Sequence, residues 1–204
     1  MTRLTTMLLA LGIISGTLRA QTSVSGRAFG ASVRTPVTYL QSGQVTLPSE
    51  GGFVVADVDA VSALEVSVDA LTTMTSGATD IAASTAQSTA HLENVNVLNG
   101  VITAQTVIAA TSSWVSGSAG RNALGSSFTN LTVNGMLLGS GDYLPAPNTR
   151  VDLPGVGFAV LNEQIASGAS GITVNMIRVV LRDALTGLPT GEIIVASASS
   201  SVGN

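Results

Sequence analysis

The sequence predicts an all-β protein with a single domain, and three observations support this. Apolar and polar residues alternate with a period of two in nearly every apolar segment after residue 22, as in strands with one buried face. The 204-residue chain has 22 glycines, which suits many tight turns. Its hydrophobic content is 45%, mostly Ala, Val and Leu, and only 10% of residues are charged, which argues against disorder.

The first twenty residues have the pattern of a secretory signal peptide. Arg3 supplies the positive start, an apolar centre follows, and Leu18 and Ala20 occupy the −3 and −1 positions of a plausible cleavage site. The apolar stretch is too short to span a bilayer. We therefore expect a signal peptide at 1–20, an all-β domain at 21–204, and a secreted or cell-surface protein without a transmembrane segment after cleavage.

The first half of the domain contains short alternating runs. Strands are expected at 24–31, 53–58 and 64–68, and a hairpin around Ser42-Gly43 is expected to join 37–41 to 45–47. Residues 72–90 are rich in Thr, Ser and Ala. We interpret them as strand, with a short helix at 81–90 as the alternative.

The second half has clearer turns and a repeat. Asn99-Gly100 and Asn134-Gly135 predict tight turns, and 116–127 and 139–149 are expected to be loops. Apolar pairs recur every 20 or 21 residues, at Leu131/Val133, Val151/Leu153, Ile172/Val174 and Ile193/Val195. This spacing suits both β-solenoid rungs and antiparallel hairpins. Because aromatic residues are only 3% of the chain, a narrow solenoid-like core is favoured, with an antiparallel β-sandwich as the alternative.

The charges are few and all basic residues are arginines. The six arginines after the signal are scattered along the sequence among twelve acids, so we expect no nucleic-acid partner. Cysteine is absent, so stability outside the cell must come from burial and sheet hydrogen bonds.

Several long strings carry a family resemblance. They are NVLNGVITAQTVIAATSS, FTNLTVNGMLL, PNTRVDLPGVGFAVLNEQ, ITVNMIRVVL and GEIIVASA, and the opening SVSGRAFGASV fits as well. In these strings the chain resembles the choice-of-anchor P family of secreted bacterial surface proteins, most clearly over 93–198. The resemblance implies export, an extracellular or surface location, and attachment by varied C-terminal signals. It implies no enzymatic role and no functional residues.

Calcium is the only metal for which the sequence offers candidate ligands. The densest acidic run is Asp57, Asp59, Glu65 and Asp69, and oxygen ligands suit Ca²⁺. No calcium-loop motif joins them, so a solvated strand face is the simpler interpretation, with Asp57 and Asp59 as same-face neighbours. Zinc lacks ligands, since the chain has one histidine and no cysteine. We expect no cofactor.

His91 and Glu163 would carry the chemistry if the protein were an extracellular hydrolase. No G-x-S-x-G motif is present, however. We interpret His91 as a solvent-facing residue at a strand entrance and Glu163 as a solvent-exposed strand end. The sequence thus predicts a structural, adhesive or matrix protein without catalysis, with self-association or surface components as its partners. The alternatives are a carbohydrate- or calcium-binding module and, less favoured, a hydrolase.

Overall fold

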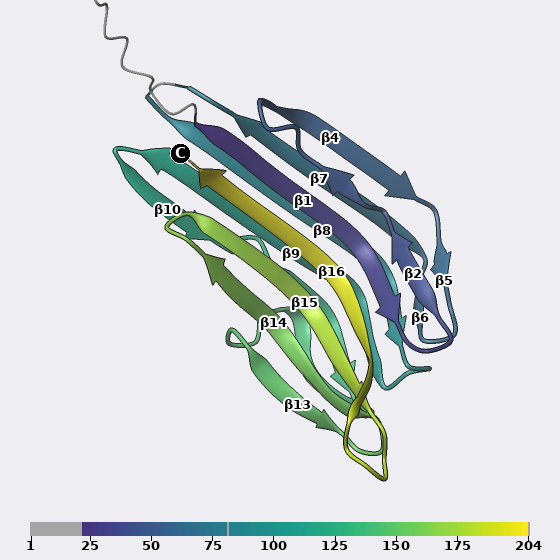
Figure 1. The fold of residues 1–204 in the computed structure, drawn as a ribbon. Coiled ribbons are helices and arrows are strands. Elements are labelled where there is room, and N and C mark those ends of the chain that lie inside the picture. The colour runs from purple at the N-terminus through teal and green to yellow at the C-terminus, as the bar shows by residue number, and fades with distance from the viewer. Residues whose placement is uncertain (1–21, 81, 204) are drawn as a thin grey trace, which may run out of the picture.

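The computed structural model describes residues 22–80 and 82–203, which form two antiparallel sheets stacked face to face (Figure 1). The all-β prediction is confirmed, because strands make up 72% of the structure and helix 0%. Within the described ranges, no helix is long and apolar enough to cross a membrane. The signal peptide predicted at 1–20 lies outside the described residues.

Sheet A, the seven-stranded sheet, is built from both ends of the chain. Its order is β13-β14-β15-β16-β1-β2, and β3 also pairs with β1. The first and last strands run side by side through eleven registered residue pairs. The strands are β1 (Ser23–Arg34), β2 (Tyr39–Ser42), β3 (Val45–Thr46), β13 (Thr149–Leu153), β14 (Gly157–Ser167), β15 (Gly171–Arg182) and β16 (Pro189–Gly203).

Sheet B, the nine-stranded sheet, is one continuous segment of chain inserted between β3 and β13. Its main order is β12-β11-β9-β8-β6-β5. Beside this path, β7 pairs with β8 and with β4, and β10 pairs with β9. The strands are β4 (Gly51–Val58), β5 (Val61–Ser62), β6 (Val66–Val68), β7 (Ala70–Ala78), β8 (Ser84–Val97), β9 (Ile102–Ser116), β10 (Ser118–Asn122), β11 (Ser127–Val133) and β12 (Met136–Tyr143).

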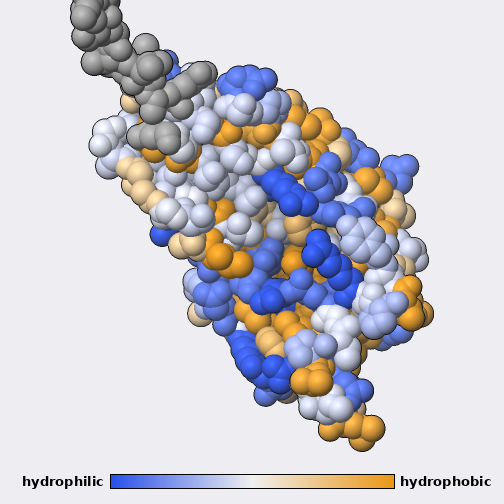
Figure 2. Space-filling model, in the orientation of Figure 1, coloured by the Kyte–Doolittle hydropathy of each residue, from blue (hydrophilic) through white to orange (hydrophobic). Residues whose placement is uncertain are grey.

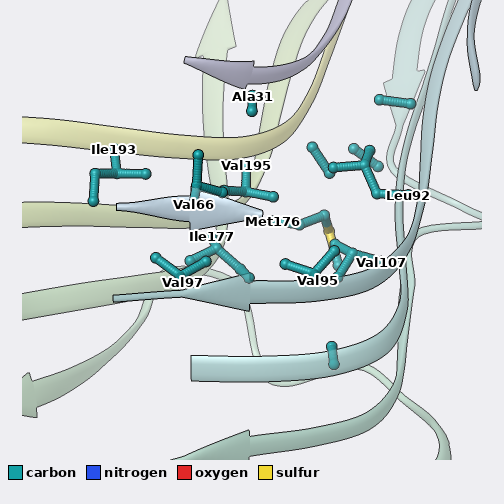
Figure 3. Packing of buried hydrophobic residues seen from close by; sticks show 14 of the residues in the cluster. Ala31, Val66, Leu92, Val95, Val97, Val107, Met176, Ile177, Ile193 and Val195 are labelled. Carbon is teal, nitrogen blue, oxygen red and sulfur yellow. The ribbon is translucent and has the colours of Figure 1, made fainter. Parts of the chain in front are cut away.

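The core lies between the sheets, where β1, β15 and β16 pack on β7, β8 and β9. Aliphatic side chains dominate it, and Phe128 is its only fully buried aromatic residue. Figure 3 shows Met176 of sheet A beside Val95 and Val107 of sheet B, within one apolar cluster. Inward positions on adjacent strands therefore supply a continuous buried layer, as expected for a sandwich.

The structure is the antiparallel sandwich and not the favoured solenoid-like core. Every described strand pairing is antiparallel, and the spacing of 20 or 21 residues belongs to strands such as β15 and β16 that return beside each other. Few aromatics suffice because small residues bring the sheets close together at one end. A Cβ added to Gly26 would lie 2.0 Å from Thr75 Oγ1 and 2.9 Å from Ser88 Oγ.

The local predictions hold best at turns. Asn99-Gly100 and Asn134-Gly135 connect β8 to β9 and β11 to β12, all four residues with positive φ. Residues 72–90 fall mainly within β7 and β8, so the strand interpretation is confirmed and the helix alternative is wrong. The expected loops are partly wrong, because β10 lies within 116–127 and β12 continues to Tyr143.

The predicted hairpin around Ser42-Gly43 is wrong. β2 and β3 do not pair with each other; both pair with β1, at different points along it. The reason is the length of β1, whose twelve residues accept the two short strands one after the other. The strand expected at 64–68 is also shorter, since β6 starts at Val66.

Candidate functional site

The outer face of sheet A gathers most of the arginines. Of the six in the described residues, five lie on it, and we call this surface the arginine face: Arg27 and Arg34 on β1, Arg150 on β13, and Arg178 and Arg182 on β15. The arginines are scattered along the sequence but lie together on one face in the structure, because strands that are distant in the chain are neighbours in sheet A. Figure 2 views the molecule from this side and shows hydrophilic and hydrophobic residues close together.

Sheet A bends along a row that crosses β14, β15 and β16. Asn162 (φ 49°) and Ala196 (φ 54°) have left-handed backbone in mid-strand, which is uncommon for residues other than glycine. At this row two successive residues are fully buried on each strand, Met176 with Ile177 and Val195 with Ala196. Because the extra residue lengthens the inner side, the sheet bends so that its outer face is concave.

A hydrogen-bonded ladder lies in this concave region. Ser197, Asn175 and Glu163 stand opposite one another on β16, β15 and β14. Ser197 Oγ donates to Asn175 Oδ1 (2.7 Å), and Asn175 Nδ2 donates to Glu163 Oε2 (2.7 Å). All three are on the outer face, yet their exposed fractions are only 4%, 5% and 8%. The interpretation of Glu163 as a solvent-exposed strand end is therefore wrong, because the bend places it mid-strand in a hollow.

Arg178 joins the ladder to a second carboxylate. Its Nη1 donates to Glu163 Oε1 (2.9 Å) and its Nε donates to Glu192 Oε1 (2.6 Å). The hydrogen bond to Glu192, together with the charges of both carboxylates, raises the pKa of Arg178 although partial burial opposes this. Both oxygens of Glu163 thus accept hydrogen bonds, and the residue is built into an ion pair.

Phe158 lies between two guanidinium groups on the same face. The Cζ atoms of Arg150 and Arg182 are 4.0 Å and 5.1 Å from the centre of its ring. Arg150 also pairs with Asp152 at 3.0 Å. Arginine and aromatic side chains in contact are typical of protein interfaces, so this part of the arginine face has the composition of a binding surface.

The outer face of sheet B has the opposite curvature. Asn94 (φ 52°) and Asn130 (φ 55°) are left-handed in mid-strand. Here the two successive residues that face the same way point outward: both Glu93 and Asn94 are exposed on β8, and exposed Gln105 with half-buried Thr106 stands between buried Ala104 and Val107 on β9. The extra residue lengthens the outer side, so this face is convex.

The convex face is also acidic. Residues 51–143, which build sheet B, hold seven acids and one arginine, a net charge of −6. We call this surface the acidic face, and its exposed carboxylates belong to Asp57, Asp69, Glu93 and Asp142. Three of these accept from neighbours on the same sheet: Asp57 from Thr72 (2.6 Å), Asp69 from Asn94 (3.0 Å) and Asp142 from Thr129 (3.0 Å).

The structure does not bring the four calcium candidates together. Asp57 is the next-to-last residue of β4, Asp59 follows that strand, and Asp69 lies just before β7, where it accepts a hydrogen bond from Asn94. Glu65 was expected on a solvent face, which is wrong: it is 8% exposed and accepts from Thr38 (2.9 Å) and Thr35 (3.4 Å). The connection between β1 and β2 covers it. Among the described residues, no three His, Asp or Glu side chains are grouped so that they could hold a metal ion.

His91 and Glu163 lie on opposite outer faces. His91 is in the middle of β8, opposite Thr72 and Ile108, and not at a strand entrance. Glu163 is on β14 of sheet A, so the whole sandwich separates the two side chains. A hollow of about 430 Å³ lies at the strand ends, lined by Val115, Ala119, 167–171 and 201–203, and contains neither residue.

No family model, curated protein or solved structure matches the chain. The resemblance to choice-of-anchor P proteins therefore stays a prediction. The ladder and the arginine face could not be predicted from the sequence, since both depend on strands that are distant in the chain. Asparagines inside apolar strand patterns, at 94, 130 and 162, are the signal that could have indicated the bends, because asparagine adopts left-handed backbone more readily than most residues.

Proposed function

We propose that the protein is an exported, non-enzymatic surface protein with an adhesive or matrix role, and that it acts through the arginine face. The observation that carries this proposal is the grouping of five arginines with Phe29 and Phe158 on one concave sheet face. These side chains are spread over an open sheet surface and do not converge in a closed cleft. Arginine and aromatic residues are the types that are enriched in protein interfaces.

The placement of the aromatic residues supports the same proposal. Of seven aromatics, only Phe128 is fully buried. The core is filled by aliphatic residues, so the remaining aromatic side chains lie partly or fully at the surface. Aromatic and arginine side chains contribute most of the binding energy in many interfaces, which favours a binding role for the faces of this sandwich.

The candidate catalytic residues support a role without chemistry. A general base must lie within hydrogen-bond reach of the group on which it acts, and His91 and Glu163 face away from each other across the sandwich. Glu163 is further engaged by Asn175 and Arg178. We therefore infer that the ladder stabilises the concave face and is not a reaction centre.

A second candidate function is binding of an acidic polysaccharide. The observation that favours it is Phe158 with Arg150 and Arg182, because an aromatic ring can stack on a sugar while guanidinium groups pair with its carboxylates or sulfates. The protein would then be a carbohydrate-binding module that binds its ligand through the same concave face. Both functions use the same residues, and they differ in the partner.

The test is retention of the labelled, exported protein on the surface of the cells that produce it. We expect the double variant Arg150→Ala/Arg182→Ala to bind at least tenfold less, since both side chains of the Phe158 group are removed. Arg121→Ala is the matched control, because Arg121 lies on β10 and donates to Gly168 O (2.7 Å), outside the arginine face. His91→Ala should also bind like the unmodified protein.

Equal retention of the double variant and the control, with circular dichroism unchanged, would exclude the arginine face as the binding surface. Loss of retention with His91→Ala alone would instead indicate a specific site on sheet B.

A further inference from the structure

We propose that the arginine face binds the acidic face of a second copy of this chain, so that copies stack head to tail. This inference rests on the proposed function and names the partner of the same surface. Three observations carry it: opposite charge, opposite curvature and a sufficient area.

The two outer faces have opposite charge. The arginine face carries five arginines and the three carboxylates of Asp152, Glu163 and Glu192, a net charge of +2. These carboxylates already pair with Arg150 and Arg178. Within the described part of the chain, no ion pair is formed by Arg27, Arg34 or Arg182. These three guanidinium groups are exposed and are therefore available to carboxylates of another molecule.

The acidic face offers those carboxylates. Asp57, Glu93 and Asp142 lie on β4, β8 and β12, so the negative charge extends across the sheet. The sixth arginine does not neutralise this face, because Arg121 donates to Gly168 in the turn between β14 and β15 of sheet A. Opposite potentials on two surfaces favour their association and fix their orientation.

The two faces also have opposite shapes. Each sheet has its own left-handed residues at the bend. In sheet A the second of two successive residues on the same side points inward, which makes the arginine face concave; in sheet B it points outward, which makes the acidic face convex. Glu163 and Asn175 are nearly buried at the bottom of the concave face, whereas Asn94 and Gln105 are exposed at the top of the convex one. One face can therefore receive the other.

The size of the concave face is sufficient as well. The four long strands of sheet A, β14, β15, β16 and β1, have 11 to 15 residues. At about 4.8 Å per strand and roughly 40 Å in length, they give a face of roughly 800 Å² per copy. This is about the area that a standard protein interface buries on each partner.

The arrangement leads to open stacks. The two surfaces are on opposite sides of the sandwich, so a copy that uses its arginine face still presents its acidic face. An interface between two different surfaces closes only if its rotation forms a ring; otherwise it continues. We therefore expect the association to grow with protein concentration without a fixed end point.

The test uses light scattering of the exported protein and two charge-reversal variants. One variant, Arg27→Glu/Arg182→Glu, changes only the arginine face; the other, Asp57→Arg/Glu93→Arg, changes only the acidic face. We expect each variant alone to be monomeric at about 100 µM. An intact interface with a micromolar Kd would be largely associated at that concentration. Mixed in equal amounts, they should form a discrete one-to-one dimer, because each supplies the face that the other lacks. Arg121→Glu is the control and should stack like the unmodified chain.

Salt gives a test that needs no variant. The unmodified protein should form stacks at about 20 mM salt, where the screening length is roughly 20 Å, and should lose at least tenfold in association at about 1 M salt. A protein that stays monomeric at low salt and about 100 µM would overturn the proposal. So would a mixture of the two folded variants that forms no dimer.

These outcomes separate the two proposals. If Arg150→Ala/Arg182→Ala loses cell-surface retention while the unmodified protein remains monomeric, the proposed function stands, stacking is wrong, and an acidic polysaccharide becomes the partner to test. If stacks form but retention does not depend on these arginines, the stacking stands and the adhesive function of this face is wrong.

Discussion

The two ends of the sandwich interior are built from different side chains. Where β1 begins and β16 ends, many inward positions hold small or hydroxylated residues, among them Gly26, Thr75, Ser88, Ser113 and Ser200, and only a small apolar cluster of Val24, Leu47, Ala86 and Val202 lies beside them. Towards the opposite end they hold large aliphatic residues such as Val33, Ile193, Val179, Val97 and Ile102. Both ends belong to the same two sheets, so the same alternation of inward and outward residues accommodates hydrogen-bonded hydroxyl groups at one end and aliphatic packing at the other.

The difference shows how hydroxyl groups can take part in a sandwich core. Ser113 of sheet B and Ser200 of sheet A share a hydrogen bond of 2.8 Å across the interior, and Thr75 and Ser88 share one of 2.9 Å. In each pair one hydroxyl group donates a hydrogen bond to the other, so both can be buried without leaving a polar atom unpaired. The aliphatic end depends instead on the area removed from water.

The largest expected effect is at the aliphatic side of this comparison. Phe128→Ala removes the one fully buried aromatic ring and leaves a cavity, so unfolding should become easier by about 3–5 kcal/mol. Urea denaturation of the variant measures this directly. Phe53→Ala is the control, because Phe53 is 63% exposed, and its loss should change the free energy of unfolding by no more than about 0.5 kcal/mol.

Gly26→Ala tests the close approach of the sheets at the small end. The new Cβ would lie 2.0 Å from Thr75 Oγ1, so Thr75 must move and weaken its contact with Ser88. We expect a loss of roughly 1–3 kcal/mol in thermal or urea unfolding. Gly203→Ala, also on a sheet A strand, should be nearly neutral, because its nearest atom outside adjacent residues would be Ser23 Oγ at 3.4 Å. Equal stability of both variants would show that the sheets are not closely packed at Gly26.

The smallest effect concerns the shared hydroxyls. Ser113→Ala leaves Ser200 Oγ without its buried partner, which should cost about 1 kcal/mol. The double variant Ser113→Ala/Ser200→Ala removes both groups and should recover most of that loss. A double-mutant cycle with additive effects would contradict a cross-sheet hydrogen bond.

Alternation and turn residues predicted the strands well, because period two and Asn-Gly pairs are local signals. The choice between solenoid and sandwich failed, because it assumed that a sandwich needs large side chains everywhere, and residues such as Gly26 and Ser113 show that it does not. The exposure of Glu65 and Glu163 was also misjudged. Both are covered by segments far away in sequence, which no pattern along a single strand can indicate.

The pairing of β1 with β16 has a consequence for how the chain reaches this structure. Ser23 lies opposite Gly203, so sheet A cannot be completed until residue 203 has been synthesised. Sheet B pairs only within 51–143 and can form earlier. Contacts of such long sequence separation slow folding. We infer that sheet B forms first and serves as the template on which the two ends of the chain later meet.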